Sequence, residues 1–135
     1  MRLMLETSAY SAFMRGHPRV EAAIRQAGRI VFRPIVLGEL QSGFLRGAHS
    51  RRNQDQLETF LGSQRVSLSV VDRETSLRYA EILRYLQSAG IPIPTNDIWI
   101  AAGAMQYGLR VITTDGHFLR IPQILVEFCG QTESN

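Results

Sequence analysis

Short runs of branched and aromatic residues alternate with stretches of helical spacing along the whole chain, and this alternation limits the folds open to it. The runs have the composition and the polar borders of strands, and they lie at residues 3–5, 30–32, 66–70, 110–113 and 124–128. Helical spacing of apolar residues falls at 9–15, 20–27, 36–44, 53–61, between Asp72 and Gly90, and at 95–107. The pattern predicts an α/β fold with a mainly parallel sheet of four to five strands and helices on both faces.

The length of 135 residues is enough to bury one core and too short for two independent domains. We therefore expect a single domain over residues 1–130 and a loose tail at 131–135. Apolar stretches fall well short of the roughly 20 residues that cross a bilayer, and Glu6 lies where a signal peptide would be apolar. These features predict a cytoplasmic protein. A single cysteine, Cys129, excludes an intramolecular disulfide and a cysteine-based zinc site.

The basic residues are all arginines, and the net charge is +3. Guanidinium groups suit bidentate phosphate contacts, so the composition permits a nucleic acid or an acidic protein segment as partner. Codon bias in the genome explains the absence of lysine equally well. Arg46, Arg51 and Arg52 form a basic cluster that we interpret as a contact for RNA phosphates, with a solvated helix end as the alternative.

Two acids follow strands directly, since Glu6 comes after residues 3–5 and Asp115 after residues 110–113. Ligands of open parallel sheets bind at the carboxyl ends of strands. Asp97 lies in the first turn of its helix, on a face whose next residues, Ile100 and Ala101, are apolar. An acid that faces the core needs a partner.

Glu39 lies beside the apolar stripe of the helix that follows the second strand, among small residues that leave room for a ligand. Taken alone, Glu39 is explained as a solvated residue, Asp97 as a helix cap and Asp115 as a turn residue. Together with Glu6 they form a carboxylate cluster that repels itself unless a cation neutralises it. Oxygen ligands of this kind select Mg²⁺ or Mn²⁺, which support phosphodiester hydrolysis.

Four short motifs resemble those of the PIN-domain family, in the right order and over nearly the whole chain. They are Leu5-Glu6-Thr7-Ser8-Ala9-Tyr10, Gly38-Glu39-Leu40, Thr95-Asn96-Asp97 and Thr113-Thr114-Asp115-Gly116-His117-Phe118. The resemblance implies a Rossmann-like PIN fold and, at this length, a VapC-type toxin endoribonuclease that forms dimers and is inhibited by a VapB antitoxin. It further implies that Glu6, Glu39, Asp97 and Asp115 bind metal directly or through water, with Mg²⁺ expected and Mn²⁺ possible. Thr7, Ser8 and Thr113 are then hydroxyls that orient these carboxylates.

Glu6 departs from the family pattern, which has aspartate at this position. The extra methylene shifts the carboxylate by roughly an ångström in a site that tolerates little error. Retained metal binding, an inactive family member, and a residue changed to silence toxicity are the three interpretations.

Other functions remain as alternatives. Glu6 favours a non-catalytic module that binds RNA or a protein partner without cleaving. A haloacid-dehalogenase fold requires two aspartates after the first strand, and a nucleotide-binding module requires a glycine-rich loop there; the chain has neither.

The histidines, the single tryptophan and three residues of the helix between Asp72 and Gly90 carry less information. His17, His49 and His117 have no spacing that suggests a shared metal, so they receive no catalytic role. Trp99 either stacks on a base or packs between helix and sheet. Tyr79, Leu83 and Leu86 belong to a dimer interface or to the core.

Overall fold

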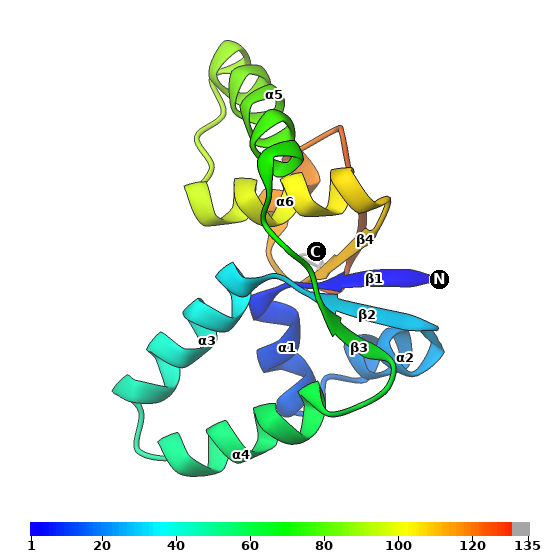
Figure 1. The fold of residues 1–135 in the computed structure, drawn as a ribbon, viewed down its shortest axis with the longest axis vertical. Helices are drawn as coiled ribbons and strands as arrows, with labels where there is room; N and C mark the ends of the chain where they lie inside the picture. The colour runs from blue at the N-terminus through cyan, green and yellow to red at the C-terminus, as the bar shows by residue number, and fades with distance from the viewer. Residues whose placement is uncertain (131–135) are drawn as a thin grey trace, which may run out of the picture.

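The computed structural model describes residues 1–130, and its centre is a five-stranded sheet in the order β3-β2-β1-β4-β5 (Figure 1). All four pairings between neighbouring strands are parallel. The strands are β1 (Arg2–Leu5), β2 (Arg29–Phe32), β3 (Val66–Leu68), β4 (Arg110–Thr113) and β5 (Leu125–Phe128). The α/β prediction is confirmed, and the sheet is wholly rather than mainly parallel.

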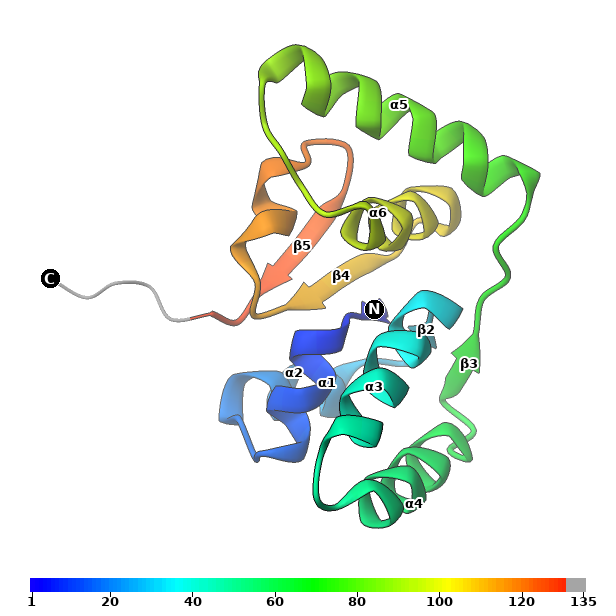
Figure 2. The ribbon, with the colours of Figure 1, turned by 90° about the vertical axis from the view of Figure 1, so that its left-hand side faces the viewer.

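Helices cover both faces of this sheet. The helices are α1 (Thr7–Met14), α2 (Pro18–Gln26), α3 (Pro34–Arg46), α4 (Ser50–Leu61), α5 (Arg73–Ala89) and α6 (Thr95–Tyr107), with a short 3₁₀ helix η1 (Gly116–Arg120). Figures 1 and 2 show α1 to α4 on one side of the sheet and α5 and α6 on the other. The connection from β3 back to β4 therefore crosses the opposite face from the connections that join β1, β2 and β3.

The core centres on β1 and α6. Leu3, Met4 and Leu5 of β1 are fully buried, as expected of the middle strand of a doubly covered sheet. Helix α6 is buried over most of its circumference, from Asp97 to Ala104. Because α6 lies between the sheet and α5, it presents little polar surface, whereas α5 covers it from outside.

Arg33 is a fully buried arginine between the sheet and α6. A Cβ atom built on Gly103 of α6 would lie 2.5 Å from Arg33 Nε, so only glycine admits the guanidinium here. Arg33 Nη1 donates to Ser69 Oγ (3.0 Å) and to the Val70 carbonyl (2.9 Å). These contacts explain why β3 ends at Leu68 rather than at residue 70 as predicted: the carbonyl of Val70 bonds to a side chain instead of a strand.

Helix ends were predicted well where a cap is present. Asp72 and Thr75 form a reciprocal capping box at the start of α5, and Gly90 ends the helix with a φ of 69°. Four helices start two or three residues before the predicted ranges: α1 at Thr7 with Glu6 as its cap, α2 at Pro18, α3 at Pro34, and α4 at Ser50, so that α4 includes Arg51 and Arg52.

The inner face of α5 packs against α6. Leu86 is buried, and Tyr79 stacks on Trp99 with ring centroids 4.1 Å apart. Of the two interpretations offered for these residues, core packing is confirmed for Leu86, and Trp99 packs between elements. Among residues 1–130, no helix combines the length and apolarity needed to span a bilayer.

Candidate metal centre

The site lies at the carboxyl ends of β1 and β4, which are neighbours in the sheet. Glu6 directly follows β1 and caps α1, and Asp115 follows β4 and caps η1. Asp97 enters from the first turn of α6, where the helix dipole favours a carboxylate. Parallel pairing thus brings together three acids that are up to 109 positions apart in the sequence.

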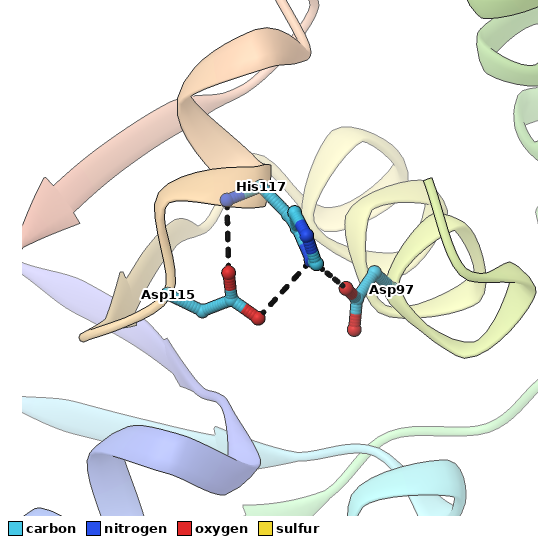
Figure 3. Close-up of side chains that lie close together, drawn as sticks. All are labelled: Asp97, Asp115 and His117. Carbon is cyan, nitrogen blue, oxygen red and sulfur yellow. Dashed lines mark hydrogen bonds and ion pairs between the residues drawn. The ribbon is translucent and has the colours of Figure 1, made fainter. Parts of the chain in front are cut away.

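His117 lies between two of these acids (Figure 3). Its Nδ1 is 3.2 Å from Asp97 Oδ2 and 3.3 Å from Asp115 Oδ2. Its backbone N–H donates to Asp115 Oδ1 at 2.9 Å, which fixes the turn that returns the ring toward the acids. Within residues 1–130, Asp97, Asp115 and His117 are the one set of three potential ligands whose donor atoms all lie within 4.8 Å of one another.

Glu6 is buried beside this cluster, but its carboxylate points back into a network of hydroxyls. Oε1 accepts a hydrogen bond from the Ser8 backbone N–H (3.0 Å). Oε2 accepts from Ser8 Oγ and from Thr113 Oγ1, the latter at 2.7 Å. Burial raises the pKa of Glu6, the bonds from Ser8 and Thr113 oppose that rise, and the charge of Asp115 adds to it.

The same hydroxyls connect Glu6 to the loop that carries Asp115. Ser8 Oγ accepts from the Thr114 backbone N–H (3.0 Å), and Thr113 Oγ1 accepts from the Asp115 backbone N–H (2.8 Å). Glu6, Ser8 and Thr113 therefore tie the start of α1 to the end of β4. The contacts agree with the predicted orienting role of Ser8 and Thr113, which stays a prediction.

Glu39 lies apart from the Asp97–Asp115–His117 group, on α3. Its Oε1 accepts a hydrogen bond from Thr7 Oγ1 at 2.6 Å. Glu39 lines an open pocket of about 530 Å³ together with Ile35, Gly38, Ser42, Arg46 and Asn96. Asn96 directly precedes Asp97 in α6, so the first turn of this helix connects the pocket to the acid cluster.

The electrostatics of the cluster favour a cation. Burial raises the pKa of Asp97 to about 6; the bond with His117 opposes the shift, and the charges of Asp115 and Glu6 add to it. Like charges in a partly buried cleft are stabilised when a cation joins them. The two carboxylates and the imidazole are all donors that divalent metals accept, so the residues present fit a metal ion.

The sequence-based prediction gave His117 no role at the metal centre, because it rested only on the spacing of the three histidines. The useful signal was its position two residues after Asp115, across a turn that contains Gly116. A side chain there can fold back onto the carboxylate that precedes it.

The three arginines singled out from the sequence divide between two surfaces. Arg46 lines the pocket that contains Glu39. Arg51 and Arg52 instead line a groove of about 670 Å³ with Met14, Asp55, Gln56, Thr59 and Phe60. The interpretation of these arginines as an RNA contact stays a prediction.

Comparison with known proteins places this geometry in a family. The model of the PIN domain matches residues 3–124. Ribonuclease VapC4 of Mycobacterium tuberculosis is 30% identical over 92 residues, covering 68% of this chain and 71% of the relative. Ribonuclease VapC5 of the same organism is 30% identical over 115 residues, covering 85% and 84%.

Solved structures agree over more of the chain. The toxin–antitoxin complex VapBC2 of Rickettsia felis, bound to a DNA fragment from its promoter, contains a chain with 28% identity and a TM-score of 0.81. VapBC-1 of nontypeable Haemophilus influenzae contains one with 25% identity and a TM-score of 0.82. Each match covers 95% of this chain and 98% of the other.

Proposed function

Since this chain belongs to the PIN-domain family, and within it to the VapC-type ribonucleases, we propose that it is the toxin of a type II toxin–antitoxin system and cleaves RNA with a divalent metal. The observation that carries the proposal is the Asp97–His117–Asp115 cluster, which lies at the carboxyl end of the sheet beside an open pocket. A parallel sheet binds its ligands at this edge.

Asp97 and Asp115 are the acids that we assign to Mg²⁺, with Mn²⁺ as an alternative. Such an ion would polarise a phosphoryl oxygen and lower the pKa of a water, which would make that water easier to deprotonate for attack on phosphorus. Thr113 Oγ1 accepts a hydrogen bond from the Asp115 backbone N–H and so helps to orient the Asp115 carboxylate. In this proposal Glu6 and Glu39 do not contact the ion directly. They act on the cluster through hydroxyl groups or water.

Glu39 is suited to accept a proton. Thr7 donates to Oε1 and holds the carboxylate beside the pocket, and we assign Oε2 as the acceptor for the attacking water. A base must lie within hydrogen-bond reach of that water, which the position of Glu39 on the wall of the pocket permits.

The RNA strand is proposed to lie along the face of α3 that lines this pocket. Arg46 is seven residues beyond Glu39, or about 10 Å along a helix. A guanidinium at this position reaches a phosphate that flanks the one being cleaved, whereas Arg51 and Arg52 face a different groove.

Arg46→Gln therefore weakens RNA binding several-fold and lowers the salt dependence of binding by about 0.7 in log–log slope, the value for one phosphate contact on a single strand. Arg51→Gln is the matched control and leaves both unchanged. Fluorescence anisotropy over a range of salt concentrations measures the effect. Equal losses in the two variants would refute this path for the RNA.

The groove lined by Arg51, Arg52, Met14 and Phe60 is the proposed docking surface for a VapB-type antitoxin. It combines apolar side chains with guanidinium groups, which suits an amphipathic protein segment better than RNA. A homodimer is proposed to form through exposed apolar residues of the β3–α5 region, which include Leu68, Val70 and Leu77. The cytoplasm is the proposed compartment.

Cleavage is tested directly with purified protein and a broad RNA pool, with Mg²⁺, with Mn²⁺ and with chelator. We expect metal-dependent cleavage that Asp97→Asn abolishes. The second candidate function is a non-catalytic binding module. The hydrogen bonds that both Glu6 oxygens accept, Oε1 from the Ser8 backbone N–H and Oε2 from the Thr113 hydroxyl, favour it. Cleavage that appears only after Glu6→Asp would establish that alternative, and no cleavage even then would refute the ribonuclease proposal.

A further inference from the structure

We propose that His117 is a metal ligand through Nδ1, together with Asp97 and Asp115, and that Glu6 is a positioning residue outside the ligand set. The site then has a mixed nitrogen and oxygen donor set, which prefers Mn²⁺ to Mg²⁺ more strongly than carboxylates alone do. The inference rests on the proposed function only in taking the metal centre to be the reactive site.

The separations within the cluster fit one ion. Neighbouring ligands at about 2.1 Å from an octahedral ion lie about 3 Å apart. Nδ1 of His117 is 3.2 Å from one Asp97 oxygen and 3.3 Å from one Asp115 oxygen. Both separations from Nδ1 are close to this value, and the three donor atoms all lie within 4.8 Å of one another, so one ion between them can be reached by all three side chains.

The ring is held for this role from its own backbone. The His117 N–H donates to Asp115 Oδ1, so the carboxylate presents Oδ2, the atom that faces the ring. Asp97 presents its Oδ2 from the opposite side, as Figure 3 shows. Nδ1 thus points between two carboxylates. A cation at this place can bind Nδ1 and both carboxylates at once, whereas a proton on Nδ1 bonds to only one of the carboxylates.

Glu6 is excluded from the ligand set by the hydrogen bonds that it already makes. Its longer side chain reaches back to cap α1, and Ser8 and Thr113 donate to it in a buried environment. If the carboxylate turned toward a metal, the buried hydroxyl of Thr113 would lose the acceptor that it has at 2.7 Å. The substitution that departs from the family pattern therefore moves this acid from binding metal to holding the loop of Asp115.

Nitrogen donors change which ion binds best. Imidazole suits transition metals, whereas Mg²⁺ prefers carboxylate and water oxygens. Loss of His117 should for this reason weaken the binding of Mn²⁺ more than the binding of Mg²⁺. Displacement of bound Mn²⁺ by Mg²⁺ measures this preference.

The test is electron paramagnetic resonance of the metal-free chain titrated with Mn²⁺. We expect bound Mn²⁺ to show the nitrogen modulation of a coordinated imidazole in pulsed spectra of the native chain. His117→Asn should remove that modulation and weaken Mn²⁺ binding by tenfold or more, since changes around metal sites cost about 10–100-fold. His49→Asn, which changes the exposed histidine at the N-cap of α4, is the control and should keep both.

Glu6→Gln tests the second half of the proposal. It keeps a side-chain oxygen that accepts from Ser8 and Thr113, so it should lower Mn²⁺ affinity much less than Asp97→Asn, which removes a ligand. The proposal is overturned if the native spectrum has no nitrogen modulation, if His117→Asn retains it, or if Glu6→Gln is as damaging as Asp97→Asn. The native spectrum decides the ligand question even if a variant fails to fold. A nitrogen-coordinated Mn²⁺ in a chain that cleaves no RNA would instead refute the proposed function and leave this inference standing.

Discussion

Helix α6 places one buried charged residue, Asp97, in its first turn and contacts another, Arg33, near its middle, and the surroundings of the two differ. At its first turn, Asp97 meets Asp115 and His117 beside an open pocket, and the His117 side chain is 47% exposed. Two turns further on, Gly103 covers Arg33, which is fully enclosed. Like charges gathered at an opening are arranged for a ligand, whereas a single enclosed charge under a glycine is arranged for packing.

The polar contacts of the two regions also differ. Arg33 Nη1 has two protein acceptors that join α3 to the segment before α5, whereas its buried Nε and Nη2 have no partner among residues 1–130. Burial lowers the pKa of the guanidinium. At the other end of α6, burial raises the pKa of Asp97, and the charges of Asp115 and Glu6 add to the rise. A bound cation offsets the cost of burying this charge.

The largest effect is expected from Asp97→Asn, which should reduce RNA cleavage by at least about a thousandfold, the scale for loss of a key electrostatic group. The same variant should stabilise the metal-free protein at pH 7.5 by about 1–2 kcal/mol, because it removes a buried charge whose pKa is raised. Kinetics and thermal unfolding in chelator measure the two effects. Loss of activity accompanied by lower stability would mean that Asp97 is structural, like Arg33.

The next largest effect is expected from Gly103→Ala, which should destabilise the fold by about 2–4 kcal/mol through overpacking against Arg33. Gly43→Ala is the control, since a Cβ there meets nothing within 4 Å, and in a helix it should stabilise by about 0.5–1 kcal/mol. Denaturant unfolding measures both. Similar results for the two variants would contradict the close contact at Gly103.

A smaller effect is expected from pH. The pKa of Asp97 is raised to about 6, so protons compete with metal below that value, and metal affinity should fall by up to about tenfold for each pH unit below 6. In the metal-free protein the sign is reversed: stability should decrease as pH rises from about 4 to 6, because the unfolded chain releases the Asp97 proton first. Calorimetry over this window measures the slope of metal affinity, and thermal unfolding in chelator measures the slope of stability. Asp97→Asn should flatten the slope of stability.

Much of the fold could be predicted because the strands are short, apolar and separated by capped helices. Asp72 and Gly90 mark both ends of α5 in the sequence, and Leu3 to Leu5 identify the central strand. The end of β3 could not be predicted, since it depends on Arg33, which lies 37 positions before Val70. A long-range contact of a side chain with the backbone has no local pattern.

The candidate site shows the same division. Parallel strands bring Glu6 and Asp115 to one edge, so their proximity follows from sequence position alone. The direction in which each carboxylate points does not, because Glu6 is turned by Ser8 and Thr113 and His117 by the turn at Gly116. Sequence reasoning located the acids and missed the imidazole.

Calorimetric titration of the metal-free chain with Mn²⁺ at pH 7.5, compared with Asp97→Asn and Gly43→Ala, tests the central claim most directly. We predict saturable binding to the native chain and to Gly43→Ala, and its loss in Asp97→Asn. Absence of binding to the native chain, or binding that Asp97→Asn leaves unchanged, would contradict the assignment of this cluster as a metal centre.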